Sequence, residues 1–249
     1  MNEKESIKKT KQSFEKSFSE KSYYDAQTQD KKQMMDIFNI LSLRENMNIL
    51  DLGTGSGYLA FPLAKQNPTC CVIGLDIVTN TLEDNREKVL DNHMTNLDFA
   101  EYDGIDFPFE EETFDLIVVR FALHHFPDIK KAFAEMSRVL KKGGQLFISD
   151  PTPNDNDTSG FVDAYMQTKH DGHIKFYFQK EYTELAQEAG FVLNQYFSSE
   201  IRFPRKTTEE SLKILADFDS QTVEGYHIRI EDDEIFITEK VLNMSFVKR

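Results

Sequence analysis

The stretch DLGTGSG, from Asp51 to Gly57, decides the fold of this chain. An apolar, strand-like segment (47–50) precedes it, and a helix-like stretch begins at Tyr58. Glycine lets the backbone adopt positive φ and lets a ligand approach closely. Amides at the start of the following helix can then hold an anionic group. The stretch therefore predicts a strand, a glycine turn and a helix that together form a binding site.

Strand-like and helix-like segments alternate on both sides of this turn. The predicted strands are 48–52, 71–76, 97–102, 114–120 and 145–150, and the predicted helices are 31–43, 58–66, 79–91 and 128–140. Segment 114–120 is almost wholly apolar, as expected for a strand covered on both faces. Gly143 and Gly144 are typical of a helix end and are expected to close helix 128–140. This alternation is typical of a doubly wound parallel sheet.

The alternation breaks after Asp150. The further predicted helices are 161–169, 180–189 and 207–219, and the last two predicted strands, 191–201 and 234–248, are expected to pair antiparallel. The last helix is expected to begin at Thr207 or Thr208, with Glu210 as the capping-box partner. The predicted fold class is α/β: a doubly wound, mostly parallel seven-stranded sheet (Rossmann-like) with an antiparallel edge strand and an inserted helical cap.

The composition argues against several classes of function. The net charge is −14, from 43 acidic and 29 basic residues. We expect no nucleic-acid partner, because affinity for nucleic acid comes largely from phosphate neutralisation. No stretch approaches the roughly 18 apolar residues of a membrane span, and the Lys/Glu-rich N-terminus lacks the apolar core of a signal peptide. We expect a cytoplasmic protein without a membrane span, whose oligomeric state the sequence leaves open.

Two carboxylates follow later strands of the predicted sheet. Asp76 ends strand 71–76, 23 residues after Gly53, where a carboxylate can accept both hydroxyls of a ribose. Asp103 precedes Gly104, and a carboxylate beside an exposed amide can bind the edge of an adenine. The glycine pattern is G-x-G-x-G, whereas the dinucleotide fingerprint is G-x-G-x-x-G. The residues therefore favour an adenosine-containing ligand other than a nicotinamide dinucleotide.

Four blocks in this order resemble the class I S-adenosylmethionine-dependent methyltransferases, in particular the small-molecule group that includes ubiquinone/menaquinone methyltransferases. The blocks are LDLGTGSG (50–57), GLDIV (74–78), EYDGIDFPFEEETFDLIVVRFALHHF (101–126) and RVLKKGGQLFISD (138–150). The resemblance covers about residues 43–150 and is weaker at 177–192. It implies S-adenosyl-L-methionine as cofactor and methyl transfer to a small-molecule acceptor by in-line displacement, with catalysis mainly by positioning.

The resemblance also implies nine cofactor-binding residues. They are Asp51, Gly53, Gly55, Gly57, Asp76, Ile77, Asp103, Gly104 and Arg120. The turn glycines would hold the methionine part, Asp51 its ammonium group and Asp76 the ribose. Asp103 and Gly104 would bind adenine, and Arg120 would lie near the sulfonium. Structural roles stay open here, since Asp103 could cap a turn and Arg120 could form an ion pair.

Two histidines are the candidate catalytic residues. His125 follows strand 114–120 at the carboxyl edge of the sheet, where it could deprotonate the acceptor or line the pocket. His173 lies in the insertion after the fifth strand, where this family commonly builds its acceptor pocket, although a polar loop is an equal alternative. We expect no metal site, because the adjacent residues His124 and His125 diverge and no third ligand is evident.

The resemblance implies one methyltransferase domain over residues 31–249, with 151–180 and 202–220 as acceptor-side insertions. Residues 1–30 are interpreted as an N-terminal arm or lid, in which Tyr23 and Tyr24 are candidates to cover the cofactor. Two other functions stay open: an S-adenosylmethionine-binding protein without catalysis, and an NAD(P)-dependent oxidoreductase, which would share Asp76. The sequence does not identify the acceptor.

Overall fold

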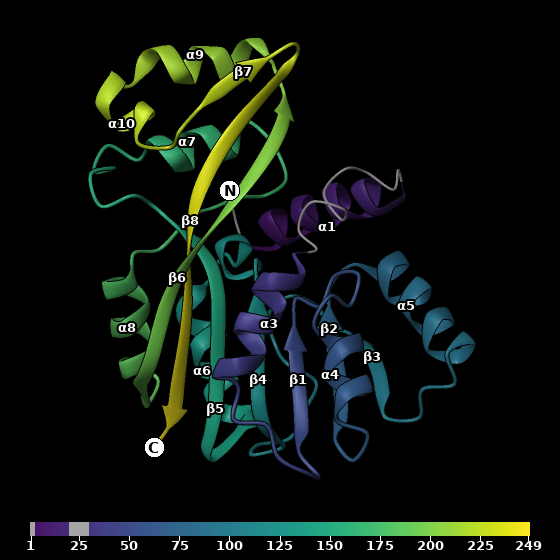
Figure 1. Cartoon of the computed structure of the whole chain (residues 1–249). Coiled ribbons are helices and arrows are strands. Elements are labelled where there is room, and N and C mark those ends of the chain that lie inside the picture. The colour runs from purple at the N-terminus through teal and green to yellow at the C-terminus, as the bar shows by residue number, and fades with distance from the viewer. Residues whose placement is uncertain (1–2, 20–29) are drawn as a thin grey trace.

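The computed structural model describes residues 3–19 and 30–249 (Figure 1). Tyr23 and Tyr24, the two tyrosines expected to cover the cofactor, lie outside the described residues. The described chain forms a sheet covered by helices on both faces, with two long strands that run beyond the sheet into a second helical layer (Figure 1).

The sheet follows the order β3-β2-β1-β4-β5-β8-β6, and a short β7 pairs with β8. Strands β1 to β5 pair in parallel, whereas β8 is antiparallel to both β5 and β6. The strands are β1 (Asn48–Leu52), β2 (Cys71–Asp76), β3 (Leu97–Glu101), β4 (Phe114–Arg120), β5 (Leu140–Thr152), β6 (Phe191–Lys206), β7 (Arg229–Glu231) and β8 (Glu234–Lys248). The predicted α/β fold class, a mostly parallel sheet with an antiparallel strand at its edge region, is confirmed.

Two apolar cores fix the helices to opposite faces of the sheet. Ile37, Leu63 and Leu82 belong to one core, and they come from α3 (Lys31–Ile40), α4 (Ala60–Gln66) and α5 (Thr79–Asp91). Phe133 and Tyr182 belong to the other core and come from α6 (Ile129–Val139) and α8 (Gln179–Glu188). The alternation of strand and helix in the sequence produces this arrangement, because each crossover helix buries its apolar stripe on the sheet.

The upper part of β6 and β8 carries the helical cap (Figure 1). Helices α7 (Phe161–Gln167), α9 (Glu209–Asp217) and α10 (Ser220–Glu224) lie there beside β7. A separate apolar core holds the cap on these strands, and it includes Phe161, Tyr165, Tyr226, Ile235 and Ile237.

Helix α1 (Glu3–Ser19) packs against the start of α5 and the end of β3. The Lys11 ammonium donates to the Thr79 hydroxyl (2.9 Å) and to the Glu101 carboxylate (2.7 Å). The Asn80 amide donates to the carbonyl of Glu15 at 3.0 Å. These contacts place α1 beside the carboxyl edge of the parallel strands, where doubly wound sheets bind their ligands.

The role predicted for Gly143 and Gly144, to close helix 128–140, is wrong. Helix α6 ends at Val139, and β5 begins at Leu140, which pairs with Phe114. Gly143 has a φ of +74° but lies inside this longer strand, where the register shifts between Phe114 and Leu116. The glycine pair therefore serves an irregular strand start, because glycine suits a bulge as well as a helix end.

Two local details of the C-terminal part also differ from the prediction. Thr208 caps α9, and its capping-box partner is Ser211, not Glu210. The Thr208 hydroxyl accepts from the Ser211 amide at 3.0 Å, because the partner lies three residues after the cap. Strand β7 adds an eighth strand that the sequence did not predict.

Candidate active site

The glycine turn is held between β2 and β4 at the carboxyl edge of the sheet. The amides of Gly53 and Thr54 donate to the carbonyl of Leu75 at 2.8 and 3.2 Å. Gly53 has a φ of +68°, and a Cβ there would lie 2.5 Å from the Cβ of Ala122. Both the backbone conformation and the close approach of the next chain segment therefore require glycine at this position.

Asp51 lies under the turn with its carboxylate buried. The carboxylate accepts from the Thr54 hydroxyl (2.7 Å) and from the amide of Ala60 (3.1 Å). It thereby caps α4, because the formal N-cap residue Leu59 offers no side-chain hydrogen bond. Burial raises the pKa of the Asp51 carboxyl to about 7, although the Thr54 hydrogen bond acts in the opposite direction. A neighbouring cation would therefore change the protonation of Asp51 near neutral pH.

Asp76 ties the turn to the end of β2. One carboxylate oxygen accepts from the amide of Gly55 at 2.8 Å, and the other accepts from the amide of Val78 at 3.0 Å. The Asn85 side chain donates to the carbonyl of Gly55 at 2.7 Å. Burial raises the pKa of Asp76. Each carboxylate oxygen has two lone pairs, so both can still accept a hydroxyl from a ligand above the turn.

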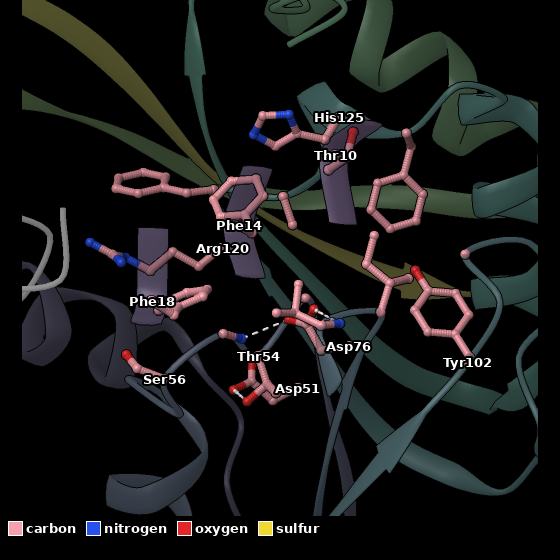
Figure 2. A pocket seen from close by; sticks show the side chains of 18 of the residues that line it. Thr10, Phe14, Phe18, Asp51, Thr54, Ser56, Asp76, Tyr102, Arg120 and His125 are labelled. Carbon is pink, nitrogen blue, oxygen red and sulfur yellow. Dashed lines mark hydrogen bonds between the residues drawn. The ribbon is translucent and has the colours of Figure 1, made fainter. Parts of the chain in front are cut away.

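A pocket of about 990 Å³, measured with its open mouth, lies above these carboxylates (Figure 2). Its floor is the glycine turn and the ends of β2 and β4, and α1 forms its roof (Figure 2). The α1 residues that line it are Ile7, Thr10, Phe14 and Phe18. Of the nine predicted cofactor residues, those that line it are Asp51, Gly53, Gly55, Asp76, Ile77, Gly104 and Arg120. The structure thus brings seven of the nine predicted residues to one cavity.

The other two predicted residues do not line this pocket. Gly57 packs against Phe61, because a Cβ at Gly57 would lie 2.5 Å from its ring. The exposed Asp103 closes a turn, and its carboxylate accepts from the amides of Ile105 (2.9 Å) and Asp106 (3.0 Å). The Asp106 hydrogen bond is the main cause that lowers the pKa of Asp103.

Arg120 lines the pocket at the end of β4 and also holds neighbouring side chains. Its guanidinium donates to the Gln33 side-chain oxygen through Nη2 at 2.6 Å and Nε at 3.1 Å. The same cation lies 4.1 Å from the centre of the Tyr58 ring and 4.0 Å from that of Phe121. Arg120 is therefore an ordered cation on the pocket wall, fixed by α3 and by two aromatic rings.

His125 points into the pocket from the 3-10 turn η1 (Leu123–His125) (Figure 2). Its ring stands edge to face with Phe14 of α1, with 5.1 Å between centroids. Its Nδ1 is buried without a hydrogen-bond partner among the described residues. Burial lowers the pKa of His125 to about 3, and His124 acts in the same direction. The imidazole is therefore neutral near pH 7 and can exchange hydrogen bonds with a ligand.

His173 is buried behind His125 and does not line the pocket. The two rings lie 6.3 Å apart between centroids. The Nε2 of His173 lies 2.8 Å from an oxygen of Asp163. Similarly, Nδ1 of His124 lies 3.0 Å from an oxygen of Asp150. Three histidines thus meet at one place, and His125 alone among them lines the pocket. Residues 3–19 and 30–249 contain no group of three His, Cys, Asp or Glu placed to hold a metal ion.

The residues that form the pocket roof were not among the predicted site residues. Ile7, Phe14 and Phe18 recur at spacings of seven and four, which is typical of one face of a helix. These residues belong to the segment 1–30 that was interpreted as an arm or lid, for which only Tyr23 and Tyr24 were named as covering residues. Thr54 and Tyr102, two further lining residues, carried no distinctive signal.

The comparisons with known proteins decide the family. Residues 43–211 match a family described as a methyltransferase domain. The chain belongs to this family. Demethylmenaquinone methyltransferase of Listeria monocytogenes serotype 4a is 29% identical over 187 residues, which cover 67% of this chain and 79% of that protein. The expected methyltransferase is thereby confirmed, and S-adenosyl-L-methionine is its cofactor.

Solved structures agree with this fold. YcgJ of Bacillus subtilis has a TM-score of 0.76 at 19% identity, covering 88% of this chain and 99% of that one. Phosphoethanolamine N-methyltransferase 2 of Haemonchus contortus, solved with S-adenosyl-L-methionine, has a TM-score of 0.62 at 21% identity. The match covers 88% of this chain and 52% of that one. Among the described helices of this chain, none is long and apolar enough to cross a membrane.

The residues present at the site fit this cofactor. The turn lacks a side chain at Gly53, where a Cβ would collide with Ala122. Asp76 presents two carboxylate oxygens with free lone pairs beneath the cavity. Asp51 and Arg120 place a carboxyl group and a guanidinium cation along the same wall. A ligand that carries hydroxyls, an ammonium and a carboxylate matches this donor and acceptor set.

Proposed function

We propose that this methyltransferase acts on a small-molecule acceptor that binds between α1 and the carboxyl edge of the sheet. The cofactor supplies a methyl group on a sulfonium, activated for in-line displacement. The protein then needs to align the acceptor and exclude water, which can contribute up to about 7–11 kcal/mol in favourable cases. The observation that carries the proposal is Asp76, buried under the pocket with its two oxygens fixed by the amides of Gly55 and Val78.

Each part of the pocket has a proposed ligand group. Asp76 accepts the two ribose hydroxyls, and Asp51 faces the methionine ammonium. Gly104 lies on the adenine side, where Ile7 closes over it: a Cβ at Gly104 would lie 2.9 Å from Ile7. An adenine contact of Asp103 would use the carboxylate oxygen that does not bind the amides of its own turn. Arg120 is proposed for the methionine end.

His125 is proposed to orient the acceptor. It is neutral, it lines the pocket and it lacks a hydrogen-bond partner at Nδ1. Its pKa of about 3, lowered mainly by burial, makes it a poor general base. We therefore assign it a hydrogen bond to the acceptor and not the removal of a proton. A catalytic part for His173 stays a prediction, because its ring lies behind that of His125.

We also propose that the N-terminal arm (1–30) acts as a lid. Helix α1 meets the floor at three places: Ile7 over Gly104, Phe14 against His125, and Phe18 at 3.6 Å from a Cβ built on Gly55. Such a roof excludes water from the site, which methyl transfer requires. The segments 151–180 and 202–220 are proposed as the acceptor side.

The function is tested by following S-adenosylhomocysteine release by mass spectrometry from a panel of small acceptors. Demethylmenaquinone belongs in the panel, because the Listeria relative bears that name. Phenols, amines and thiols complete it. Formation of a methylated product that depends on both partners supports the proposal. Cofactor binding without turnover of any acceptor would instead favour a binding protein without catalysis.

We expect cofactor affinity to depend on pH through Asp51. Its pKa in the free protein is about 7, raised by burial, so the carboxyl is protonated at lower pH. An ammonium group nearby stabilises the ionised form, so binding releases a proton. Linkage then predicts about a tenfold loss of S-adenosyl-L-methionine affinity from pH 8 to pH 6. Isothermal titration calorimetry measures the affinity at each pH. The Asp51→Asn variant is expected to bind S-adenosyl-L-methionine more weakly and with little pH dependence. An unchanged wild-type affinity over this range would contradict the assignment.

We expect the α1 roof to contribute to cofactor affinity. Ile7→Ala removes apolar contact above Gly104 and should weaken S-adenosyl-L-methionine binding about three- to tenfold, since one or two methyl groups buried against the ligand contribute about 1 kcal/mol. Lys8→Ala is the matched control, because Lys8 lies exposed on the same helix. Equal affinities of the two variants would show that α1 does not cover the bound cofactor.

A further inference from the structure

Five polar residues form a cluster behind the pocket, in which Tyr165 and Glu239 are buried and the other three are partly buried. Tyr165 comes from α7, Lys169 and Asp171 from the loop that follows, Arg205 from β6 and Glu239 from β8. The Arg205 guanidinium lies 3.5 Å from a Glu239 oxygen, and the Lys169 ammonium lies 2.9 Å from an Asp171 oxygen. The Arg205 cation also lies 5.9 Å from the centre of the Tyr165 ring. We call these five residues the β6–β8 polar cluster.

Several atoms of this cluster are buried without any hydrogen-bond partner among the described residues. They are Nε and Nη1 of Arg205, Oε2 of Glu239 and the hydroxyl of Tyr165. Glu239 and Tyr165 are each only 1% exposed. A buried polar atom without a partner costs about 1–3 kcal/mol, and more when it is charged. Four such atoms in one place therefore point to a ligand group that completes their hydrogen bonds.

The cluster adjoins the wall of the pocket that holds His125. Asp171 and Lys169 both influence the pKa of His125, and His173 influences the pKa of both His125 and Glu239. Thr10 of α1 lines the pocket on this side and closes against the loop: a Cβ at Gly172 would lie 2.0 Å from its hydroxyl oxygen. A shift of α1 at Thr10 would thus join the pocket to the cluster.

The charges of the cluster restrict what can bind there. Arg205 pairs with Glu239, and Lys169 pairs with Asp171, so the cluster has no excess charge. An ionised group would leave a net buried charge, which is strongly unfavourable. The unpartnered atoms include donors on Arg205 and an acceptor on Glu239, with a hydroxyl on Tyr165 that can do either. A neutral group that both accepts and donates hydrogen bonds matches this set.

The bare nitrogen of His173 adds a second acceptor. In the tautomer with the hydrogen on Nε2, this nitrogen donates to the Asp163 carboxylate, which only accepts. Its Nδ1 is then an acceptor, and it is buried without a partner. A hydrogen-bond donor on a ligand therefore has two possible acceptors, which are Nδ1 of His173, nearer His125, and Oε2 of Glu239 on β8.

We propose that the β6–β8 polar cluster binds a neutral, oxygen-bearing polar group of the methyl acceptor, such as a hydroxyl-bearing ring or a carboxamide. This inference rests on the proposed function, since it concerns the acceptor of the same reaction. Arg205 donates to the ligand oxygen, and Glu239 accepts from its O–H or N–H. The cluster thus selects acceptors by hydrogen bonding at a distance from the methyl group.

Four matched probes test this selection in the wild-type protein saturated with S-adenosylhomocysteine. They are benzamide (neutral and polar), benzoate (anionic), benzylamine (cationic) and toluene (apolar). Ligand-observed NMR titration ranks their affinities, and we expect benzamide to bind at least fivefold more tightly than the other three. A ranking led by benzoate, benzylamine or toluene, or no binding of benzamide, would overturn the proposal.

Substitution of Glu239 tests whether benzamide binds at the β6–β8 polar cluster. Glu239→Gln keeps the shape but removes the carboxylate, and should weaken benzamide binding about five- to tenfold, the effect of about one hydrogen bond. Glu200→Gln is the control, because it makes the same change on the exposed side of β6. Arg205→Lys is the second variant and is expected to behave like Glu239→Gln.

The two proposals fail in different ways. Each variant is first shown to bind S-adenosyl-L-methionine with wild-type affinity and to unfold at a comparable temperature. Absence of cofactor binding in the wild-type protein would overturn the proposed function itself. Normal cofactor binding together with unchanged benzamide affinity in the folded variants would overturn only the proposal that the cluster binds a group of the acceptor. A crystal structure with ordered water alone in the cluster, at saturating benzamide, would do the same.

Discussion

Replacing Asp76 by alanine is expected to weaken S-adenosyl-L-methionine binding by about 100-fold or more. Without the carboxylate, the complex would lose two charge-assisted hydrogen bonds to the ribose, each worth about 1.5–3 kcal/mol. The amides of Gly55 and Val78, which donate to Asp76 at 2.8 and 3.0 Å, would lose their acceptor as well. Isothermal titration calorimetry measures the affinity, and thermal unfolding shows whether the fold is retained.

Two further variants separate ligand contact from local structure. Asp76→Asn keeps one accepting oxygen and the shape of the side chain, so its loss should be smaller than that of alanine. Asp84→Ala removes the same charge from an exposed position on α5 and should leave affinity unchanged. Wild-type affinity in a folded Asp76→Ala protein would show that the cofactor does not use the end of β2.

The second large effect is expected at the glycine turn. Gly53→Ala should lower the free energy of unfolding by about 2–4 kcal/mol, from left-handed backbone strain and from overpacking. The φ of Gly53 is +68°, and the added Cβ would lie 2.5 Å from the Cβ of Ala122. Cofactor affinity should fall with it, because the turn that faces the ligand must shift. Chemical denaturation of the free protein measures the stability.

Gly160→Ala is the matched control for this substitution. Gly160 also has a positive φ, +78°, but nothing lies within 4 Å of an added Cβ. Its cost should be about 1–2 kcal/mol, from the backbone alone, and cofactor binding should be unchanged. The difference between the two variants therefore isolates the close approach of Ala122. Equal costs would mean that the turn can move away from the chain segment after β4.

The parallel half of the fold could be predicted from the sequence in detail. The bounds of β1, β2, β4 and α5 match their predicted ranges. The three strands are buried between two helical layers, so their apolar runs and the polar residues at their ends are both visible in the sequence. The positions of Asp51 and Asp76, which we propose bind the cofactor, follow from the same pattern, because the ends of adjacent parallel strands must meet at one edge.

The remaining features depend on contacts between distant segments. The roof of the pocket needs α1 to dock on α5 and β3 through Lys11, which no local pattern indicates. The β6–β8 polar cluster joins residues from four elements and depends on the unusual length of both strands. Gly143 illustrates a local ambiguity, since the same positive φ serves a helix end or an irregular strand.

A crystal structure of the protein with S-adenosylhomocysteine would show whether the carboxyl ends of β1 and β2 hold the cofactor. We expect ribose hydroxyls within hydrogen-bonding distance of both Asp76 oxygens, the methionine part over the Gly53–Gly55 turn, and α1 above the adenosine. A ligand bound away from the carboxyl ends of β1 and β2, with the Asp76 carboxylate contacting only the amides of Gly55 and Val78, would contradict it.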